Sequence, residues 1–159
     1  MFNQGNTWSL LSSTRCYAPT GVPAVACPFM ARTTTIKVRF YELDPYSHVN
    51  HTAYFGYFET ARIEALEAVG LAMDQMSAAG IHVVVVEMNA RFVRPAVSGD
   101  TLRIESEVVE RGRASSKWQQ RMFRDDTLIA TLEIRAAVTD LDGKPTRFPA
   151  EFAEAFAAL

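Results

Sequence analysis

The sequence contains few cysteines and none after residue 27. Its two cysteines, Cys16 and Cys27, both lie near the amino terminus. A zinc site built on thiolates and a disulfide framework are therefore excluded from the rest of the chain. This usage suits a reducing compartment, where disulfides rarely persist. We therefore predict a cytoplasmic protein.

The chain also lacks a long apolar segment, an excess of positive charge and a glycine-rich phosphate motif. Its longest aliphatic run, residues 81–86, includes a histidine and is far shorter than the roughly 20 apolar residues of a membrane-spanning helix. The formal net charge of −2 does not indicate a nucleic-acid partner, which usually demands a basic surface. No phosphate-loop signature is present. We therefore expect neither a membrane nor a nucleic acid as partner.

A length of 159 residues suits one domain with its own core. Residues 1–30 differ from the rest, because they contain no acidic residue, three prolines and many serines and threonines, without a helical or strand period. An over-long start that ends at Met30, a targeting peptide and a surface extension all fit this composition. We predict an extension over residues 1–30, non-native or loosely ordered, and a single domain over residues 31–159.

From residue 33 the hydrophobic pattern becomes regular. The clearest element is a helix over residues 51–69, because Tyr54, Phe58, Ala61 and Ala65 share one face and a glycine follows. Strands are predicted over residues 35–41, 81–93, 101–110, 116–124 and 127–139, and shorter helices over residues 71–79 and 151–159. The aliphatic run at 81–86 predicts that the second strand is buried. This order favours an α+β domain in which an antiparallel sheet wraps around the central long helix.

One polar stretch carries groups suited to chemistry. Asp44 lies in a loop between the first strand and the long helix, and Pro45 disfavours helical geometry at that position. His48, Asn50 and His51 follow within seven residues. The start of a helix presents unpaired backbone N–H groups and the positive end of its dipole, which stabilise an oxyanion. A nearby carboxylate can attack a carbonyl directly or deprotonate a water molecule.

This stretch resembles the signature of the 4-hydroxybenzoyl-CoA thioesterase family, and it is most similar to the bacterial long-chain acyl-CoA thioesterase branch. The matching positions are Asp44, the His48–Asn50 triplet, Tyr54 and the Glu59–Arg62 segment. The segment Arg91–Asp100 is similar to a second family motif. The similarity of organisation covers residues 33–157 and implies the hotdog fold.

The resemblance implies hydrolysis of acyl-CoA thioesters to a carboxylic acid and coenzyme A. It places the catalytic carboxylate at Asp44, as nucleophile or general base, and the carbonyl-polarising backbone N–H at His51. Tyr54 matches an aromatic position that borders the acyl site. Water is the co-substrate, and no metal or other cofactor is expected. The resemblance also implies a homodimer or homotetramer with its active sites at the subunit boundary.

Other roles for these side chains remain open. His48 either contacts the substrate or holds the loop in shape, and Asn50 is a substrate ligand or, more commonly for this residue type, a helix N-cap. Glu59 and Arg62, three residues apart, are predicted to form an ion pair. The remaining candidates come from charge clustering alone: the phosphates of coenzyme A are assigned to Arg111, Arg113 and Lys117. Such a cluster is otherwise a solvated strand end.

Two further functions compete with acyl-CoA hydrolysis. An acyl carrier protein can supply the thioester in place of coenzyme A, and the basic cluster at residues 111–117 would then face that acidic donor. A non-catalytic module that senses acyl-CoA is the third hypothesis. An ionisable Asp44 argues against a sensor, because a sensor needs no carboxylate facing the thioester.

Overall fold

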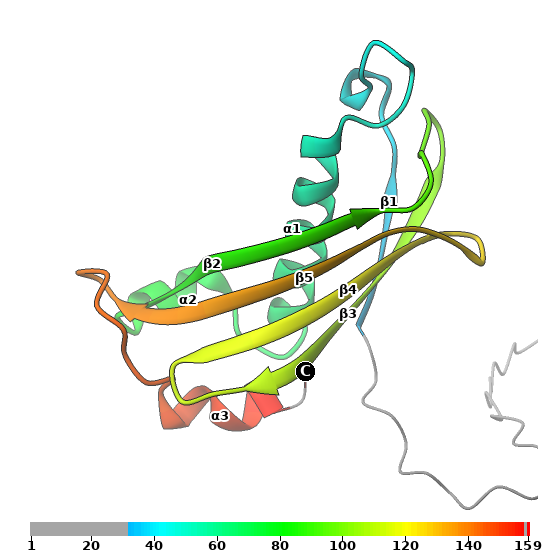
Figure 1. Ribbon diagram of the computed structural model, residues 1–159. Helices are drawn as coiled ribbons and strands as arrows, with labels where there is room; N and C mark the ends of the chain where they lie inside the picture. The colour runs from blue at the N-terminus through cyan, green and yellow to red at the C-terminus, as the bar shows by residue number, and fades with distance from the viewer. Residues whose placement is uncertain (1–31, 158) are drawn as a thin grey trace, which may run out of the picture.

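The computed structural model describes residues 32–157 and 159, so the predicted extension over residues 1–30 lies outside the described residues. Five strands, three α-helices and one short 3-10 helix follow one another in these residues (Figure 1). In chain order they are β1 (Arg32–Lys37), η1 (Phe40–Glu42), α1 (His51–Glu67), α2 (Met73–Ala78), β2 (Ile81–Phe92), β3 (Thr101–Arg111), β4 (Ser115–Arg124), β5 (Thr127–Asp140) and α3 (Ala150–Ala157). The predicted elements are confirmed with bounds that differ by a few residues, except that the strand predicted over residues 35–41 spans residues 32–37 and Phe40–Glu42 form a 3-10 helix instead.

The five strands form one sheet in the order β1-β3-β4-β5-β2, and every neighbouring pair is antiparallel. Helix α1 crosses one face of this sheet, as Figure 1 shows. The predicted α+β architecture, an antiparallel sheet around a central helix, is therefore confirmed. Among the described residues no helix is long and apolar enough to span a membrane.

Helix α1 packs on the sheet through the face that the pattern predicted. Tyr54, Phe58, Ala61 and Ala65 are all buried, and their neighbours in the core include inward-facing residues of β3, β4 and β5. The chain leaves the helix through Gly70, whose φ of 79° lies in the left-handed region that favours glycine. Burial of this stripe fixes the rotation of α1, and therefore the direction in which its first turn faces.

The burial expected for β2 is wrong for the single chain. This strand lies at an edge of the sheet and pairs only with β5 among the described strands. Val86 is 57% exposed and Met88 is 51% exposed, and His82 on the same strand is also exposed. An aliphatic run does not distinguish a central strand from an edge strand that another surface covers, because both exclude water from their side chains.

The predicted ion pair between Glu59 and Arg62 is also wrong. The Arg62 guanidinium instead donates to Oε1 of Gln120 on β4, at 2.8 Å. Gln120 is buried, and its amide donates in turn to the Phe58 carbonyl at 2.9 Å and to the Ser106 hydroxyl at 2.8 Å. These bonds satisfy polar atoms in the core and tie α1 to the middle of the sheet.

Candidate active site

The loop between η1 and α1 closes tightly on Asp44. One carboxylate oxygen, Oδ1, accepts hydrogen bonds from the backbone N–H groups of Tyr46 at 2.8 Å and His48 at 3.1 Å. The backbone N–H of Asp44 donates to the His48 carbonyl at 2.7 Å, and Ser47 adopts a φ of 62° to complete the turn. Within the described part of the chain, the second oxygen of Asp44, Oδ2, makes no hydrogen bond and remains available for chemistry.

Helix α1 begins beside this carboxylate. Asn50 is the N-cap, and its side-chain oxygen accepts from the Thr52 N–H at 3.0 Å and the Thr52 hydroxyl at 2.8 Å. The N-cap interpretation of Asn50 is confirmed, while its contact with substrate stays a prediction. His51 is the first helical residue, so its backbone N–H has no carbonyl to bond within the helix. That N–H and the helix dipole supply a site for developing negative charge.

A surface cleft of about 300 Å³ brings four of the eight predicted site residues together. Asp44, His48, His51 and Tyr54 all line it. Another wall comes from the end of β2 and the segment after it, and it consists of Phe92, Val93, Arg94 and Pro95. The sequence reasoning missed this wall as part of the site, although the Arg91–Asp100 motif that contains it was a usable signal.

Tyr54 fixes the distance between the helix and that wall. Its hydroxyl accepts a hydrogen bond from the Ala96 N–H at 3.1 Å, and its ring lies 5.1 Å from the Phe92 ring in an edge-to-face arrangement. Burial raises the pKa of the Tyr54 phenol, although the bond from Ala96 acts in the opposite direction. Tyr54 therefore stays neutral and holds the cleft open at a set width.

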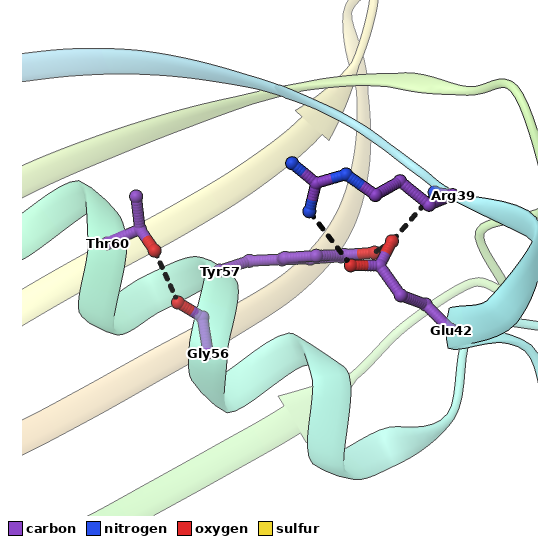
Figure 2. A network of polar contacts seen from close by, with 5 residues as sticks. All are labelled: Arg39, Glu42, Gly56, Tyr57 and Thr60. Carbon is purple, nitrogen blue, oxygen red and sulfur yellow. Dashed lines mark hydrogen bonds and ion pairs between the residues drawn. The ribbon is translucent and has the colours of Figure 1, made fainter.

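A second polar network anchors the Asp44 loop to α1. Figure 2 shows the Tyr57 hydroxyl pointing from the helix to Glu42, whose Oε2 it approaches to 2.5 Å. The same oxygen accepts from the Arg39 N–H at 2.7 Å, and the Glu42 carbonyl accepts from the Asn50 N–H at 2.8 Å. Glu42 thus joins the end of η1 to the helix start, with Asp44 between the two contacts.

The contacts in this network shift the pKa values of Glu42 and Tyr57. Burial by itself raises the pKa of Glu42, but the hydrogen bonds from Tyr57 and Arg39, together with the Arg39 charge, lower it overall. Burial, followed by the bond to the Glu42 carboxylate, raises the pKa of Tyr57. The neutral phenol and the ionised carboxylate are therefore the favoured states at neutral pH.

Tyr57→Phe is expected to lower the free energy of unfolding by about 1–3 kcal/mol, because it removes a hydrogen bond to a charged group. The folded-state pKa of Glu42 lies below its ordinary value of 4.5, so this stabilisation is present above pH 4.5 and is lost as the pH falls through the lowered value. Denaturant unfolding at pH 7 and pH 3 measures both effects. Tyr41→Phe, at a tyrosine that is 66% exposed, is the matched control. An equal loss of stability at the two pH values would contradict this account.

The predicted basic residues lie at the other end of the sheet. Arg111 and Lys117 flank the turn between β3 and β4. This turn lies beside the end of β5, which pairs with the start of β2. The Asp44 cleft, in contrast, adjoins Phe92 at the end of β2. Arg111 donates to the Phe156 carbonyl at 3.4 Å, and Lys117 pairs with Glu133 at 3.3 Å. Arg113 lies in the same turn. Within one chain, these residues are not brought to Asp44.

Arg94 is a cation that does line the cleft. Its side chain is exposed, and one guanidinium nitrogen donates to the Leu128 carbonyl at 3.2 Å. Across residues 32–157 and 159, no group of three or more His, Cys, Asp or Glu side chains is arranged to hold a metal ion. The cleft therefore offers a carboxylate, a helix N-terminus, two imidazoles and one guanidinium.

An antiparallel sheet wrapped around one helix, with a carboxylate beside the helix start, defines the hotdog-fold thioesterase class. The chain belongs to the thioesterase-like superfamily, whose family model matches residues 38–156. A crystal structure described as YbaW probable thioesterase from Escherichia coli has a TM-score of 0.71 and 32% sequence identity, over 80% of this chain and 97% of that one.

Two curated relatives show the range of named activities. The chain is 44% identical over 75 residues to the long-chain acyl-CoA thioesterase FadM of Escherichia coli. This match covers 47% of this chain and 56% of that protein. It is 28% identical to the chloroplastic acyl-acyl carrier protein thioesterase ATL3 of Arabidopsis thaliana. That match covers 76% of this chain and 65% of the plant protein, so the chain spans about two thirds of the plant relative.

Proposed function

We propose that this protein hydrolyses acyl-CoA thioesters to a free carboxylic acid and coenzyme A. One observation carries the proposal: Asp44, whose Oδ2 makes no hydrogen bond to the described residues, and His51, the first residue of α1, line the same cleft. A thioester carbonyl that accepts from this N–H develops its negative charge at the helix N-terminus. The carbonyl carbon then faces the Asp44 carboxylate.

Two routes lead from this arrangement to products. In the first, the Asp44 carboxylate attacks the carbonyl carbon, the carbon–sulfur bond breaks, and water hydrolyses the resulting acyl-aspartyl anhydride. In the second, Asp44 removes a proton from water as the water attacks, and the proton passes to the departing thiolate. Both routes need an ionised Asp44 and a polarised carbonyl, and both leave Asp44 unchanged after turnover.

A homodimer joined along β2 accounts for the exposed edge strand. The strand has 12 residues, and it presents unpaired backbone groups together with the exposed apolar side chains of Val84, Val85, Val86 and Met88. Such an edge is a template for pairing with another strand.

A second copy supplies an identical strand, and antiparallel pairing about a two-fold axis joins the two sheets. The Asp44 cleft then lies at the boundary between the subunits, because Phe92 at the end of β2 forms part of its wall. Further association to a tetramer belongs to the same proposal.

This dimer also gives the basic cluster a role. Antiparallel pairing places the end of β2 in one subunit beside the beginning of β2 in the other. Arg111, Arg113 and Lys117 of the second subunit, which lie near the beginning of β2, are thereby brought toward the first subunit's cleft. We propose that they bind the phosphates of coenzyme A together with Arg94. His48 and Asn50 contribute to binding by shaping the loop and the helix start.

Arg94→Ala is expected to raise the KM for acyl-CoA about tenfold with little change in kcat, because a guanidinium–phosphate bond contributes to binding rather than to the transition state. Steady-state kinetics with one acyl-CoA measures both constants. Arg147→Ala, at an exposed arginine that does not line the cleft, is the matched control. If Arg94→Ala leaves KM unchanged, the phosphates do not contact Arg94.

The alternative donor is an acyl carrier protein, which the name of the Arabidopsis relative favours. The test measures free-thiol release from one acyl group presented on coenzyme A and on holo acyl carrier protein. We expect the coenzyme A ester to be hydrolysed with the larger kcat/KM. Preference for the carrier-protein ester would replace the proposed donor, and binding of acyl-CoA without release of thiol would favour a sensor. A cytoplasmic location is part of the proposal and rests on the absence of cysteine after residue 27.

A further inference from the structure

A second cavity lies away from Asp44, between the later turns of α1, the start of β2 and the carboxyl-terminal segment. It has a volume of about 100 Å³. Its walls are mainly apolar, and they include Ile63, Leu66, Val83, Trp118, Phe148 and Phe156. No step of the hydrolysis at Asp44 uses this cavity. A concave apolar site of this kind next to an edge strand is suited to a small hydrophobic ligand.

The charged end of one polar side chain at this cavity, Arg62, is already engaged. Arg62 reaches its wall, but the guanidinium is held by Gln120 at 2.8 Å. Burial lowers the pKa of Arg62, and the nearby charge of Glu59 opposes that effect. The arginine therefore contributes its methylene stem to the wall while its charged end is tethered to the sheet. The surface left for a ligand is mostly hydrocarbon.

The size of the cavity selects among acyl groups. A dry apolar cavity of about 150 Å³ is sufficient for a benzene ring. The smaller volume of about 100 Å³ suits the narrow end of an alkyl chain better than an aromatic ring. The Phe148 and Phe156 rings, whose centroids lie 4.8 Å apart, line the cavity side by side. Helix α3 therefore contributes Phe156 to the cavity wall.

The cavity is distant from the Asp44 of its own chain. Ile63 follows His51 along α1 by roughly 18 Å, at a rise of 1.5 Å per residue. The β2–β2 dimer gives a shorter path. Val83 and Val85, at the start of β2, line the cavity, and antiparallel pairing places this part of the strand opposite Phe92 at the partner's cleft. The cavity of one subunit thus adjoins the reacting centre of the other.

We propose that this cavity binds the terminal methylenes of an unbranched aliphatic acyl chain whose thioester lies at the partner's Asp44. The inference rests on the proposed function and names the substrate class of that site. It makes the Phe148–Phe156 pair a determinant of chain length. It also makes each active site depend on a cavity that the other subunit supplies.

The first test compares kcat/KM over a series of saturated acyl-CoAs. Phe156→Ala should shift the optimum to longer chains, with a gain of about fourfold for each additional methylene that is buried. Ile63→Phe should fill the cavity and reduce turnover of long chains by the same factor per methylene, while acetyl-CoA, which does not reach the cavity, is hydrolysed as before. Phe123→Ala is the matched control, because Phe123 lies on β4 and does not line the cavity. An unchanged optimum in both cavity variants would overturn the proposal.

Binding separates this proposal from the proposed function. Calorimetric titration of Asp44→Asn protein with the same acyl-CoAs gives a chain-length profile without turnover. Absence of hydrolysis by the wild type would contradict the proposed function alone. An affinity that does not change with chain length, or that does not respond to Phe156→Ala, would contradict the cavity proposal.

A mixed dimer tests the contribution of the partner. One subunit carries Asp44→Asn with an intact cavity, and the other carries Ile63→Phe with an intact Asp44. If the chain crosses the boundary, the purified heterodimer has one complete site and hydrolyses long-chain acyl-CoA at about half the wild-type rate per dimer. If the chain binds within its own subunit, neither site is complete, and the heterodimer is inactive on long chains. The second outcome would overturn the proposal.

Discussion

Asp44→Asn is expected to lower kcat for acyl-CoA hydrolysis by about 10²–10⁴-fold, the range that general acid–base catalysis typically contributes. An amide neither attacks the thioester carbonyl nor accepts a proton from water. The amide oxygen still accepts from the N–H groups of Tyr46 and His48, so the loop keeps its shape. We therefore expect a free energy of unfolding within about 0.5 kcal/mol of the wild type. Free-thiol release and denaturant unfolding measure the two quantities.

The chain contains a well-matched control for this substitution. Asp140 makes the same kind of turn, because its Oδ1 accepts from the N–H groups of Asp142 at 3.0 Å and Lys144 at 2.8 Å. It lies at the end of β5 and does not line the Asp44 cleft. Asp140→Asn should therefore leave kcat unchanged. Equal turnover in wild type and Asp44→Asn would mean that Asp44 is only a turn residue and that the site lies elsewhere.

Met88→Lys is expected to convert the protein to a monomer and to reduce kcat/KM for long-chain acyl-CoA by more than about 100-fold. Met88 lies in the middle of the edge strand and is 51% exposed. Near a two-fold axis its replacement brings two ammonium groups together and removes them from water, which costs several kcal/mol. Light scattering and turnover measure the two effects.

Val109→Lys is the control for the edge substitution. Val109 is 37% exposed and lies on β3, which β4 and β5 separate from β2 in the sheet. It should leave both the mass in solution and the turnover unchanged. A wild-type protein that is monomeric and fully active would contradict both the proposed dimer and the shared cavity.

The local elements could be predicted from the sequence because their signals are local. Tyr54, Phe58, Ala61 and Ala65 recur at helical spacing, and all four are buried on the sheet. The residues of the candidate site are also close together in the sequence. Four candidates, Asp44, His48, His51 and Tyr54, lie within eleven consecutive positions, so a loop and the first turn of a helix are sufficient to gather them.

Contacts between distant segments could not be predicted in this way. The apolar run in β2 predicted burial, but sheet order places this strand at an edge. Arg62 was expected to pair with Glu59 three residues away, whereas it bonds to Gln120 on β4. Charge clustering grouped Arg111 with the coenzyme A site, although in one chain it lies at the opposite end of the sheet from Asp44.

The sequence by itself determined the strands, the helices and the chemistry of the Asp44 loop, because hydrophobic period, turn residues and helix capping act over a few neighbouring positions. Only the tertiary structure decided which strand forms the edge, that Phe92 and Arg94 face Asp44, and that a second cavity lies under α3. The physical reason is that strand order and packing join residues far apart in the chain, and no local pattern encodes which distant surface covers a given face.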